Sequence, residues 1–487
     1  MAQELDERGL TLLRKDLAKG VQTVMQSKKP GAISARKPQG RPIARQAAPS
    51  TARRPQPMVK SDHGQLKILD NLKERHYRYM HERIAERSTV LDDRIDEFAE
   101  LVRTHYKLED IGDPASTSDE DVIVVGRICC DGDTKLNEAS VELETSRLMG
   151  AGARVALKFD PNVSSNGDSS MLPLYPGAIV ALKGRNETGS WFQVSQILML
   201  PLLPLDIDSN RQEHPISMAI AAGPFSGDDL QYTHFDTFLQ TINGSAPNWI
   251  LLQIGPFVDV NNPRIREGDV DLAPNDLFRQ RILSPLRTFL DAHPGTTALI
   301  VSSVRDLISH HAVYPQPPLQ LPQSSRIVVL PNPCTFTIDH VRFSVTSVDV
   351  LFHLQRQLLR KKVIPTGTPP PIDQMSILGS CVLEQRSFYP LFPAEPELHA
   401  DVNLDVSHSE LLKLEDVAPD VLILPSNLGK FHKVVHGTTV INPAFASKGV
   451  HATLNISSAR SSSGGVSDRS TVNLHSSVSM TAALDLS

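Results

Sequence analysis

From His214 onward, short apolar runs typical of strands alternate with longer stretches typical of helices, and this alternation restricts the fold more than any other feature. The first four strand-like runs are Ile216–Ala222, Trp249–Ile254, Ala298–Ser302 and Ile327–Leu330. The helix-like stretches between them are Asp228–Ile242 and Asn275–Ala292. Later strands are expected at Val341–Thr346, Val421–Leu424, Thr438–Ile441 and Ala452–Ile456. Later helices are expected at Val350–Arg360 and Gln374–Arg386. Strands that alternate with helices predict a layered α/β domain, here over residues 206–487.

A different pattern precedes this domain. Residues 111–205 contain five short apolar runs separated by turn-rich segments such as Asp131-Gly132-Asp133 and Asn166-Gly167-Asp168. The runs are Val122–Cys130, Val141–Leu143, Val155–Phe159, Ile179–Leu182 and Trp191–Met199. Five short strands of this kind predict an oligonucleotide-binding (OB) barrel. Residues 121–200 hold seven Lys or Arg against nine Asp or Glu. A structural or protein-binding barrel is therefore favoured over one that binds single-stranded nucleic acid.

The segment 61–110 is expected to be helical. Leu91, Ile95, Phe98 and Val102 recur at helical spacing and predict an amphipathic helix. An earlier helix is suggested by Leu69, Leu72, Met80 and Ile84. Packing against a neighbouring domain is the favoured role for both helices, and binding of a partner helix is the alternative.

Residues 1–60 form an N-terminal segment with a basic linker. Residues 21–60 hold nine Lys or Arg and no acidic residue, so the remaining chain carries −6 − 9 = −15. From Lys28 to Lys60 large apolar residues are scarce, and such a segment cannot offset its ordering entropy, so disorder is expected. Its basic clusters are compatible with nucleic-acid binding, a nuclear-import signal or a solvated linker. Residues 1–26 carry only a weak helical pattern.

Several classes of protein are excluded by composition. Cys129, Cys130, Cys334 and Cys381 form no C-x-x-C pair, which argues against a zinc ribbon and for a reducing compartment. The acidic start has no apolar core of a signal peptide. The richest apolar run, Ile197–Leu205, is broken by prolines and is too short to span a bilayer. A soluble, intracellular protein is expected, with a flexible loop at 457–470 and a closing strand at Val478–Leu486.

Four loops follow strands of the α/β domain, where ligands bind in such sheets. They hold Gly223-Pro224-Phe225, Gly255-Pro256-Phe257-Val258-Asp259, Val304-Arg305-Asp306 and Ser426-Asn427-Leu428. Their spacing resembles the calcineurin-like metallophosphoesterase family, which binds two metals through D-x-H, G-D-x-x-D, G-N-H-D/E, a lone His and G-H-x-H. Ile441-Asn442-Pro443 is similar to that family's I-N-P-G-S turn.

The metal ligands of that family are largely missing here. Its Asp, Asn and His positions fall on Gly223, Phe225, Pro256, Val304, Arg305, Ser426 and Leu428. A dimetal site needs carboxylate or imidazole donors at about 2.0–2.2 Å from each ion, and these side chains offer none. Arg305 adds a permanent cation. No catalytic residue, metal ligand or cofactor is therefore predicted, although Asp259 and Asp306 with nearby histidines leave an atypical phosphodiesterase as an alternative.

The remaining candidates are weak. The side chains of the adjacent pair His310-His311 diverge in most backbones, so surface or supporting roles are favoured over metal binding. His353 is interpreted as a packed or hydrogen-bonded histidine. Cys334 and Cys381 are interpreted as small buried hydrophobic residues. None of the common nucleotide-binding or hydrolase motifs is present.

An OB-like barrel followed by a phosphoesterase-like domain without ligands resembles the B subunits of replicative DNA polymerases, in particular the branch of the polymerase α–primase complex. The segments that carry this resemblance are residues 313–318, 346–354, 385–393, 419–426 and 440–443, with residues 126–128 and 135–141 in the barrel. The resemblance covers about residues 76–456. It implies a two-sheet α/β sandwich of the calcineurin-like phosphodiesterase type that is inactive.

The same resemblance implies a non-catalytic, structural subunit in the nucleus. Its expected partners are the C-terminal domain of the polymerase α catalytic subunit and the primase subunits, in a complex that makes primers for DNA replication. DNA would be contacted only indirectly or weakly, through the basic linker, and no membrane is involved. The family's N-terminal docking domain is not evident, because only about 26 residues precede the linker. A single-strand-binding OB module remains the other alternative.

Overall fold

The computed structural model describes residues 59–61, 64–70, 75–130, 135–167, 169–206, 214–243, 249–322, 324–367, 373–458 and 465–476. All of them belong to the unit formed by residues 56–487. The expectations for residues 1–58 and for Val478–Leu486 lie outside the described part. Within the described part, no helix combines the length and apolar character needed to cross a membrane.

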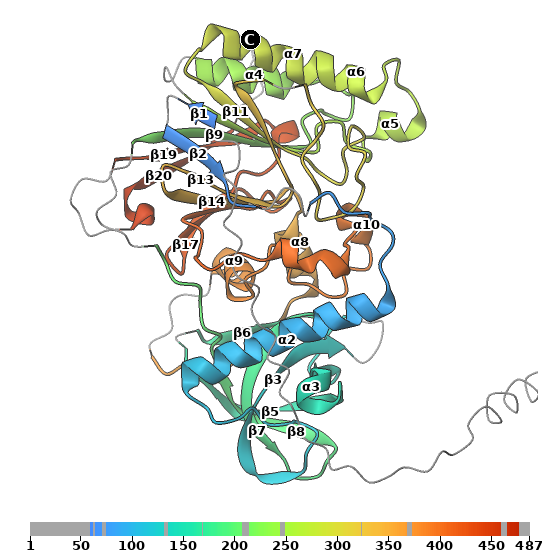
Figure 1. Cartoon of the computed structure of the whole chain (residues 1–487), viewed down its shortest axis with the longest axis vertical. Helices are drawn as coiled ribbons and strands as arrows, with labels where there is room; N and C mark the ends of the chain where they lie inside the picture. Colours follow the sequence, from blue (N-terminus) through green and yellow to red (C-terminus); the bar gives the residue numbers. More distant parts are fainter. Residues whose placement is uncertain are drawn as a thin grey trace, which may run out of the picture. The chain divides into compact units, whose positions relative to one another are not determined.

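Two β-sheets form the centre of the α/β region (Figure 1). The seven-stranded sheet has the order β1 (Val59–Ser61), β2 (Gly64–Ile68), β13 (Cys334–Ile338), β14 (Val341–Val345), β16 (Val421–Ile423), β18 (Thr438–Asn442) and β17 (Phe431–Val435). The six-stranded sheet has the order β12 (Ile327–Leu330), β11 (Thr297–Val301), β10 (Ile250–Ile254), β9 (Ile216–Ala222), β19 (Val450–Ile456) and β20 (Ser470–Ser476). Strands β9 to β12 are parallel. Apolar residues of both sheets share one buried cluster, so the predicted two-sheet sandwich is confirmed.

Helices cover the outer faces of both sheets. Over β9–β12 lie α4 (Thr233–Asn243), α5 (Pro263–Glu267), α6 (Pro274–Phe278), the π-helical turn η1 (Arg279–Leu283) and α7 (Ser284–Ala292). On the other side lie α8 (Val350–Gln357), α9 (Gln374–Glu384), α10 (His399–Val402) and η2 (Val406–Leu412). Alternate residues of the central strands β9, β10 and β11 therefore face a sheet or a helix, which explains their nearly continuous apolar runs.

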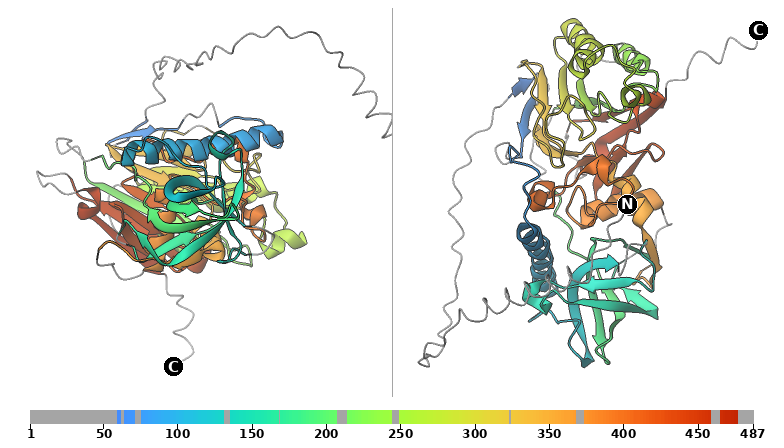
Figure 2. Two further views of the ribbon diagram at one scale, coloured as in Figure 1. Left: turned by 90° about the horizontal axis from the view of Figure 1, so that it is seen from below. Right: turned by 90° about the vertical axis from the view of Figure 1, so that its right-hand side faces the viewer.

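The five predicted barrel strands are confirmed. They form a closed barrel in the order β3 (Ser118–Cys130), β4 (Val141–Glu144), β5 (Arg154–Ser165), β8 (Trp191–Leu198) and β7 (Ile179–Asn186). The short helix α3 (Arg147–Gly150) lies between β4 and β5. The predicted amphipathic helix is α2 (Ile84–Tyr106), which packs Ile95, Phe98 and Val102 against the outside of the barrel (Figure 2).

Some predicted elements are wrong. The expected helix before Ile84 does not exist in the described residues, because β2 pairs with β13 in the sheet and residues 75–83 run to α2 without helical structure (Figure 2). The helix expected to reach Arg360 ends at Gln357, since Leu359–Lys362 forms β15 and pairs with β6 (Met171–Leu174) of the barrel region.

The ends of the expected linker and C-terminal loop also differ. Val59 and Lys60 belong to β1 instead of a disordered segment. In the described part of the 457–470 loop, residues 466–469 form a 3-10 turn, and Ser470 begins β20. Strand β20 pairs antiparallel with β19 and so extends the six-stranded sheet.

Candidate functional site at the strand ends

The loops that the sequence analysis singled out do meet in space. The backbone N–H of Gly223 donates to the carbonyl of Ile254 (2.7 Å), and that of Gly255 donates to the carbonyl of Val301 (2.8 Å). Asp259 and Asp306 form an isolated β-bridge. We call the region formed by residues 223–225, 255–259, 303–306 and 426–428 the strand-end site. It lies at the carboxyl ends of parallel strands, where open α/β sheets bind ligands.

Two glycines allow the close approach of these loops. A Cβ atom on Gly223 would lie 2.0 Å from the carbonyl oxygen of Pro256. A Cβ atom on Gly255 would lie 2.3 Å from Oδ2 of Asp306. Both positions therefore need glycine for packing, whether or not a ligand binds.

Aromatic side chains fill the volume behind the loops. Phe225 and Phe257 are buried and stack with ring centroids 5.2 Å apart and an interplanar angle of 7°. Phe235 meets Phe225 edge-on at 5.4 Å. Phe225 is one of the positions at which the sequence analysis expected a metal ligand to be missing. An aromatic hydrocarbon cluster strengthens packing and offers no lone pair to a metal ion.

Asp306 holds the loops together through backbone hydrogen bonds. It is 4% exposed and accepts hydrogen bonds from the N–H groups of Phe257, Val258 (3.1 Å) and Ser303 (3.0 Å). Burial raises its pKa to about 7, against the lowering effect of those hydrogen bonds. Both carboxyl oxygens are therefore engaged by the protein itself.

Asp259 is occupied by a cation of the chain. Arg305 Nε donates to Asp259 Oδ1 at 3.1 Å, and a second guanidinium nitrogen bonds Oδ2. Asp401 lies 4.0 Å from the same guanidinium. The bidentate geometry is the strong form of the arginine–carboxylate pair. The positive charge at this carboxylate is supplied by Arg305.

Two functional side chains were missed by the sequence analysis. Asp349 caps α8 by accepting from Phe352 N–H (3.0 Å), and its other oxygen accepts from Asn427 N–H (2.7 Å). Burial raises the pKa of this carboxyl group. Asn442 is buried and accepts from the N–H groups of Ser426 (2.9 Å) and Ala444 (2.8 Å). An Asp directly before a predicted helix was the available signal for Asp349.

The interpretation of His353 is confirmed. It is 2% exposed, and its Nδ1 lies 2.9 Å from the hydroxyl of Tyr389. Burial lowers its pKa to about 4, so it is neutral near pH 7. Cys334 and Cys381 are buried, as predicted.

The adjacent residues His310 and His311 take no part in the hydrogen bonds described above for the strand-end site. His311 is buried and meets Tyr77 edge-on at 5.0 Å, whereas His310 is exposed. Among the described residues, no group of three or more His, Cys, Asp or Glu is arranged to hold a metal ion. The strand-end site is thus a set of loops whose charged groups are neutralised or hydrogen-bonded from within.

Two family models match this chain. The model for the B subunit of DNA polymerases alpha and epsilon matches residues 218–433, which contain the strand-end site. The model for the OB domain of the DNA polymerase alpha B subunit matches residues 88–200. The DNA polymerase alpha B subunit of Schizosaccharomyces pombe is 35% identical over 405 residues, covering 78% of this chain and 67% of the relative. This chain belongs to the family of DNA polymerase alpha B subunits.

Other members of the family are similarly related. The proteins of the same name from Saccharomyces cerevisiae and Rattus norvegicus are each 30% identical, over 75% and 77% of this chain. The chain spans 58% and 60% of the lengths of these two relatives. A solved structure from Thermus thermophilus aligns with 54% of this chain and 98% of its own length at 10% identity, and its TM-score of 0.19 carries no argument about the fold.

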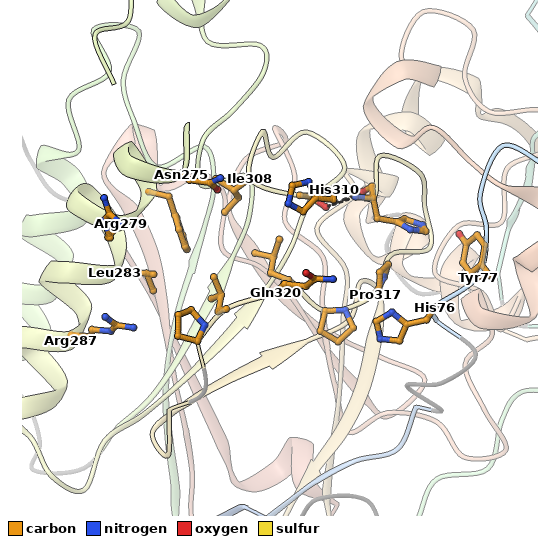
Figure 3. A pocket seen from close by; sticks show the side chains of 17 residues that line it. His76, Tyr77, Asn275, Arg279, Leu283, Arg287, Ile308, His310, Pro317 and Gln320 are labelled. Carbon is orange, nitrogen blue, oxygen red and sulfur yellow. Dashed lines mark hydrogen bonds between the residues drawn. The ribbon is translucent and has the colours of Figure 1, made fainter. Parts of the chain in front are cut away.

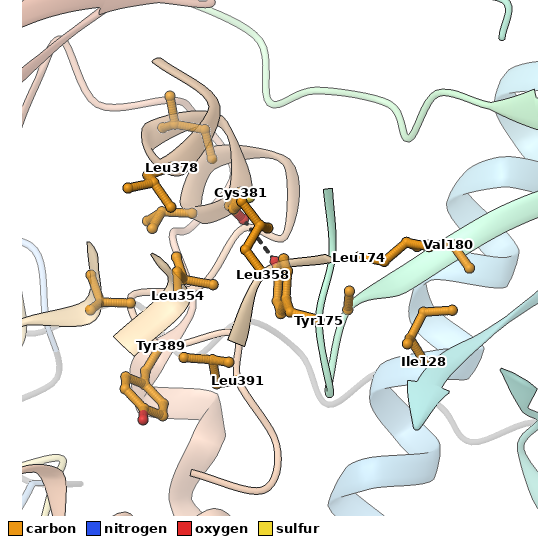
Figure 4. Packing of buried hydrophobic residues seen from close by; sticks show 14 of the residues in the cluster. Ile128, Leu174, Tyr175, Val180, Leu354, Leu358, Leu378, Cys381, Tyr389 and Leu391 are labelled. Atoms are coloured by element: carbon orange, nitrogen blue, oxygen red, sulfur yellow. Dashed lines mark hydrogen bonds between the residues drawn. The ribbon is translucent and has the colours of Figure 1, made fainter. Parts of the chain in front are cut away.

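In this member of the family of DNA polymerase alpha B subunits, the barrel and the α/β region share one hydrophobic cluster (Figure 4). Tyr175 of the barrel region is fully buried, and its hydroxyl donates to the carbonyl of Cys381 in α9 (3.5 Å). Gln385 makes two hydrogen bonds with the backbone of Ile179, at 2.9 and 2.8 Å. Strand β6 pairs with β15 across the same junction.

Backbone packing at this junction is close. Gly177 has φ +98°, and a Cβ atom there would lie 2.3 Å from the backbone nitrogen of Phe392. The Phe392 N–H donates to the carbonyl of Pro176 (3.0 Å). The guanidinium groups of Arg87 and Arg127 lie 5.1 and 5.2 Å from the centre of the Phe392 ring. Strand pairing, buried apolar area and hydrogen bonds therefore fix the barrel against the α/β region.

Proposed function

We propose that this chain is a non-catalytic accessory subunit of DNA polymerase alpha. The names of its relatives support membership of such a complex. The observation that carries the non-catalytic role is the ion pair of Arg305 with Asp259 at the strand-end site. A hydrolase of the dimetal type needs free carboxylate and imidazole donors there, to hold two ions about 3.5–4 Å apart.

We infer that the α/β region is a calcineurin-like phosphodiesterase domain that has lost its metal site. In this proposal the OB domain of the chain spans residues 111–205, and the phosphodiesterase-like domain spans residues 206–487. The alternative of a displaced metal site built from Asp259 and Asp306 is disfavoured by their contacts. Asp306 already accepts three backbone N–H groups, and Asp259 is bound by a guanidinium. A divalent ion would have to replace these interactions and overcome the charge of Arg305.

We propose that the subunit works as a rigid platform in the nucleus. The shared hydrophobic cluster gives the barrel and the α/β region a fixed geometry, which is what a partner that contacts both of them requires. The proposed partner is the C-terminal domain of the polymerase alpha catalytic subunit, within a complex that also contains primase and supports primer synthesis. Contact with DNA is proposed to be indirect, or weak and through the basic linker.

Co-expression with the C-terminal domain of the catalytic subunit tests this proposal. The two chains should co-purify in equal amounts through size-exclusion chromatography at moderate salt, with a large interface of about 2,000 Å² or more. Separate elution of the intact chains would contradict the proposal.

The non-catalytic role has its own test. Full-length protein purified in the presence of manganese should retain less than one equivalent of metal and should not hydrolyse bis-p-nitrophenyl phosphate above background. Two equivalents of bound metal together with hydrolysis, lost in Asp306→Asn, would establish the enzyme instead.

A further inference from the structure

A second concave region has none of the strand-end site residues in its lining, although its Phe278 meets Phe257 of that site at 5.4 Å between ring centroids. A cavity of about 540 Å³ is bounded on one side by the helical stretch α6–η1–α7 and on the other by residues 308–322 (Figure 3). His76 and Tyr77, which precede α2, close one end. The volume is within the range of about 300–1,000 Å³ that small ligands and anchoring side chains occupy. We call it the basic pocket.

Hydrogen bonds hold the walls of the basic pocket in place. The Tyr77 hydroxyl donates to the carbonyl of Pro315 (2.6 Å), and the Tyr79 hydroxyl donates to the carbonyl of His310 (2.9 Å). Gln316 Nε2 donates to the carbonyl of His311 (2.7 Å). The wall formed by residues 308–316 is therefore fixed to the segment before α2, and a ligand would not have to order it.

Basic side chains line the pocket and acidic side chains do not. Arg279, Arg287, His76, His310 and His311 are among its lining residues, which include no Asp or Glu. Arg279 pairs with Asp276 outside the lining, whereas the exposed Arg287 has no ion pair with the part of the chain described here. Outside residues 21–60 the chain carries a net charge of −15, so a pocket lined by two arginines and no acidic residue stands out against an acidic background.

His311, one of the lining residues, has a buried ring nitrogen without a hydrogen-bond partner in the described structure. The side chain is 8% exposed, and the nitrogen is Nε2. Burial lowers its pKa to about 4, so the ring is neutral near pH 7. Buried polar atoms in folded proteins are nearly always paired, and an unpaired one costs free energy that a ligand atom can recover.

Apolar surface separates the two arginines of the pocket from His76. Arg279 and Arg287 lie at one end of the pocket and His76 at the other, with Ile308 between them (Figure 3). Phe278, Leu283 and Leu319 add further apolar lining. An occupant that matches this order has a negative charge at the arginine end and an apolar side chain next to it.

We propose that the basic pocket binds an acidic peptide segment of a protein partner, with one apolar side chain as its anchor. A free phosphate or a nucleic-acid backbone would use the cations but leave the apolar lining exposed, so a peptide fits both features better. This inference does not depend on the assembly to which the chain belongs.

Binding of synthetic peptides to the full-length chain tests the proposal. The probe is a pool of short peptides in which Asp or Glu residues flank one Leu, Ile or Phe on both sides. The control pool replaces Asp and Glu by Asn and Gln. Peptides of the acidic pool should be retained over the control pool, and fluorescence anisotropy of one retained peptide then gives its affinity.

Variants locate the binding. Arg287→Glu should weaken the peptide about tenfold, because one attraction becomes a repulsion at a partly exposed site. Arg360→Glu, an exposed arginine on β15, makes the same change in net charge and should alter the affinity less than about twofold. His311→Phe keeps a ring but removes Nε2, and should weaken the peptide about fivefold.

Three outcomes would overturn the proposal. The first is equal retention of the acidic and the neutral pool. The second is an equal loss of affinity in Arg287→Glu and Arg360→Glu, which would reveal a general charge effect. The third is displacement of the peptide by an oligo-dT strand whose own binding is lost in Arg287→Glu, because nucleic acid would then be the occupant. Circular dichroism of each variant controls for folding.

Discussion

The strand-end site and the basic pocket both contain buried polar groups, but only one of them satisfies those groups from within. Asp306 accepts three backbone N–H groups, and Asp259 is bound by Arg305. In the basic pocket, Nε2 of His311 has no partner in the described structure. Polar residues at a position typical of catalysis can thus be purely structural, and the better pointer to a ligand is a polar group left without a partner.

The largest effect that separates the two regions is expected from the pH dependence of Asp306. Its pKa is raised from 3.8 to about 7 by burial. The folded protein holds this proton more tightly than the unfolded chain does. The resulting contribution to the free energy of unfolding is complete below about pH 4, and it is lost as the pH rises through about 7. Relative to Asp306→Asn, the free energy of unfolding of the wild type should fall by about 4 kcal/mol across this window.

Urea unfolding of both proteins at several pH values measures this difference. The exposed carboxylate of Asp269 offers a control, since Asp269→Asn should show no comparable dependence on pH. A constant difference between wild type and Asp306→Asn would mean that Asp306 is not a buried, protonatable group, and the contrast between the two regions would fail.

The next largest effect is expected from Arg305→Ala. The substitution leaves Asp259, with a side chain 5% exposed, as an unpaired buried charge. Loss of one partner from such a pair should lower the free energy of unfolding by about 3 kcal/mol, measured by urea denaturation. The control is Arg264→Ala, which breaks the exposed pair with Asp269 and should cost about 0.5 kcal/mol. Equal losses would show that the Arg305 pair is effectively solvated.

Two buried histidines sharpen the comparison at a smaller scale. His353→Phe removes the partner of the Tyr389 hydroxyl and should lower the free energy of unfolding by about 2 kcal/mol. His311→Phe removes a ring nitrogen that has no partner among the described residues, so its cost should remain below about 1 kcal/mol. Thermal denaturation of the two variants measures the difference. A larger loss for His311→Phe would indicate that its ring is already satisfied in the free protein.

The smallest effect is expected from Arg287→Ala. This exposed side chain lines the basic pocket and makes no ion pair with the described residues, so its removal should change the free energy of unfolding by less than about 0.5 kcal/mol. Thermal denaturation in parallel with Arg305→Ala is the measurement. A loss similar to that of Arg305→Ala would assign Arg287 to the fold instead of to an accessible binding surface.

Much of the architecture could be predicted because it follows from local patterns. The five barrel strands and the parallel strands β9 to β12 all coincide with apolar runs. Strand β17 was missed, since its central residues His432, Lys433 and Val434 are exposed at the edge of the sheet and give no apolar run. The first strands, β1 and β2, were missed because their place depends on pairing with β13, far away in the sequence.

The candidate site, too, was only partly predictable from local sequence patterns. The residue types at Gly223, Phe225, Pro256 and Arg305 were readable from the sequence, as was the likeness to a family of polymerase subunits. The partners of the remaining acids were not readable. Arg305 follows Asp259 by 46 positions, and Asp349 reaches Asn427 across 78. Such contacts leave no spacing that a linear pattern could reveal.

The sequence by itself determined the order of barrel and α/β region, the positions of most core strands and the residue types at the strand ends. These properties depend on residue type and on the short periods of strands and helices. Only the tertiary structure decided that Arg305 neutralises Asp259, that barrel and sheets share one core, and that side chains of α7 and of the segment before α2 meet around one pocket. Those features arise where distant segments pack together, and their energies depend on burial, which no local pattern specifies.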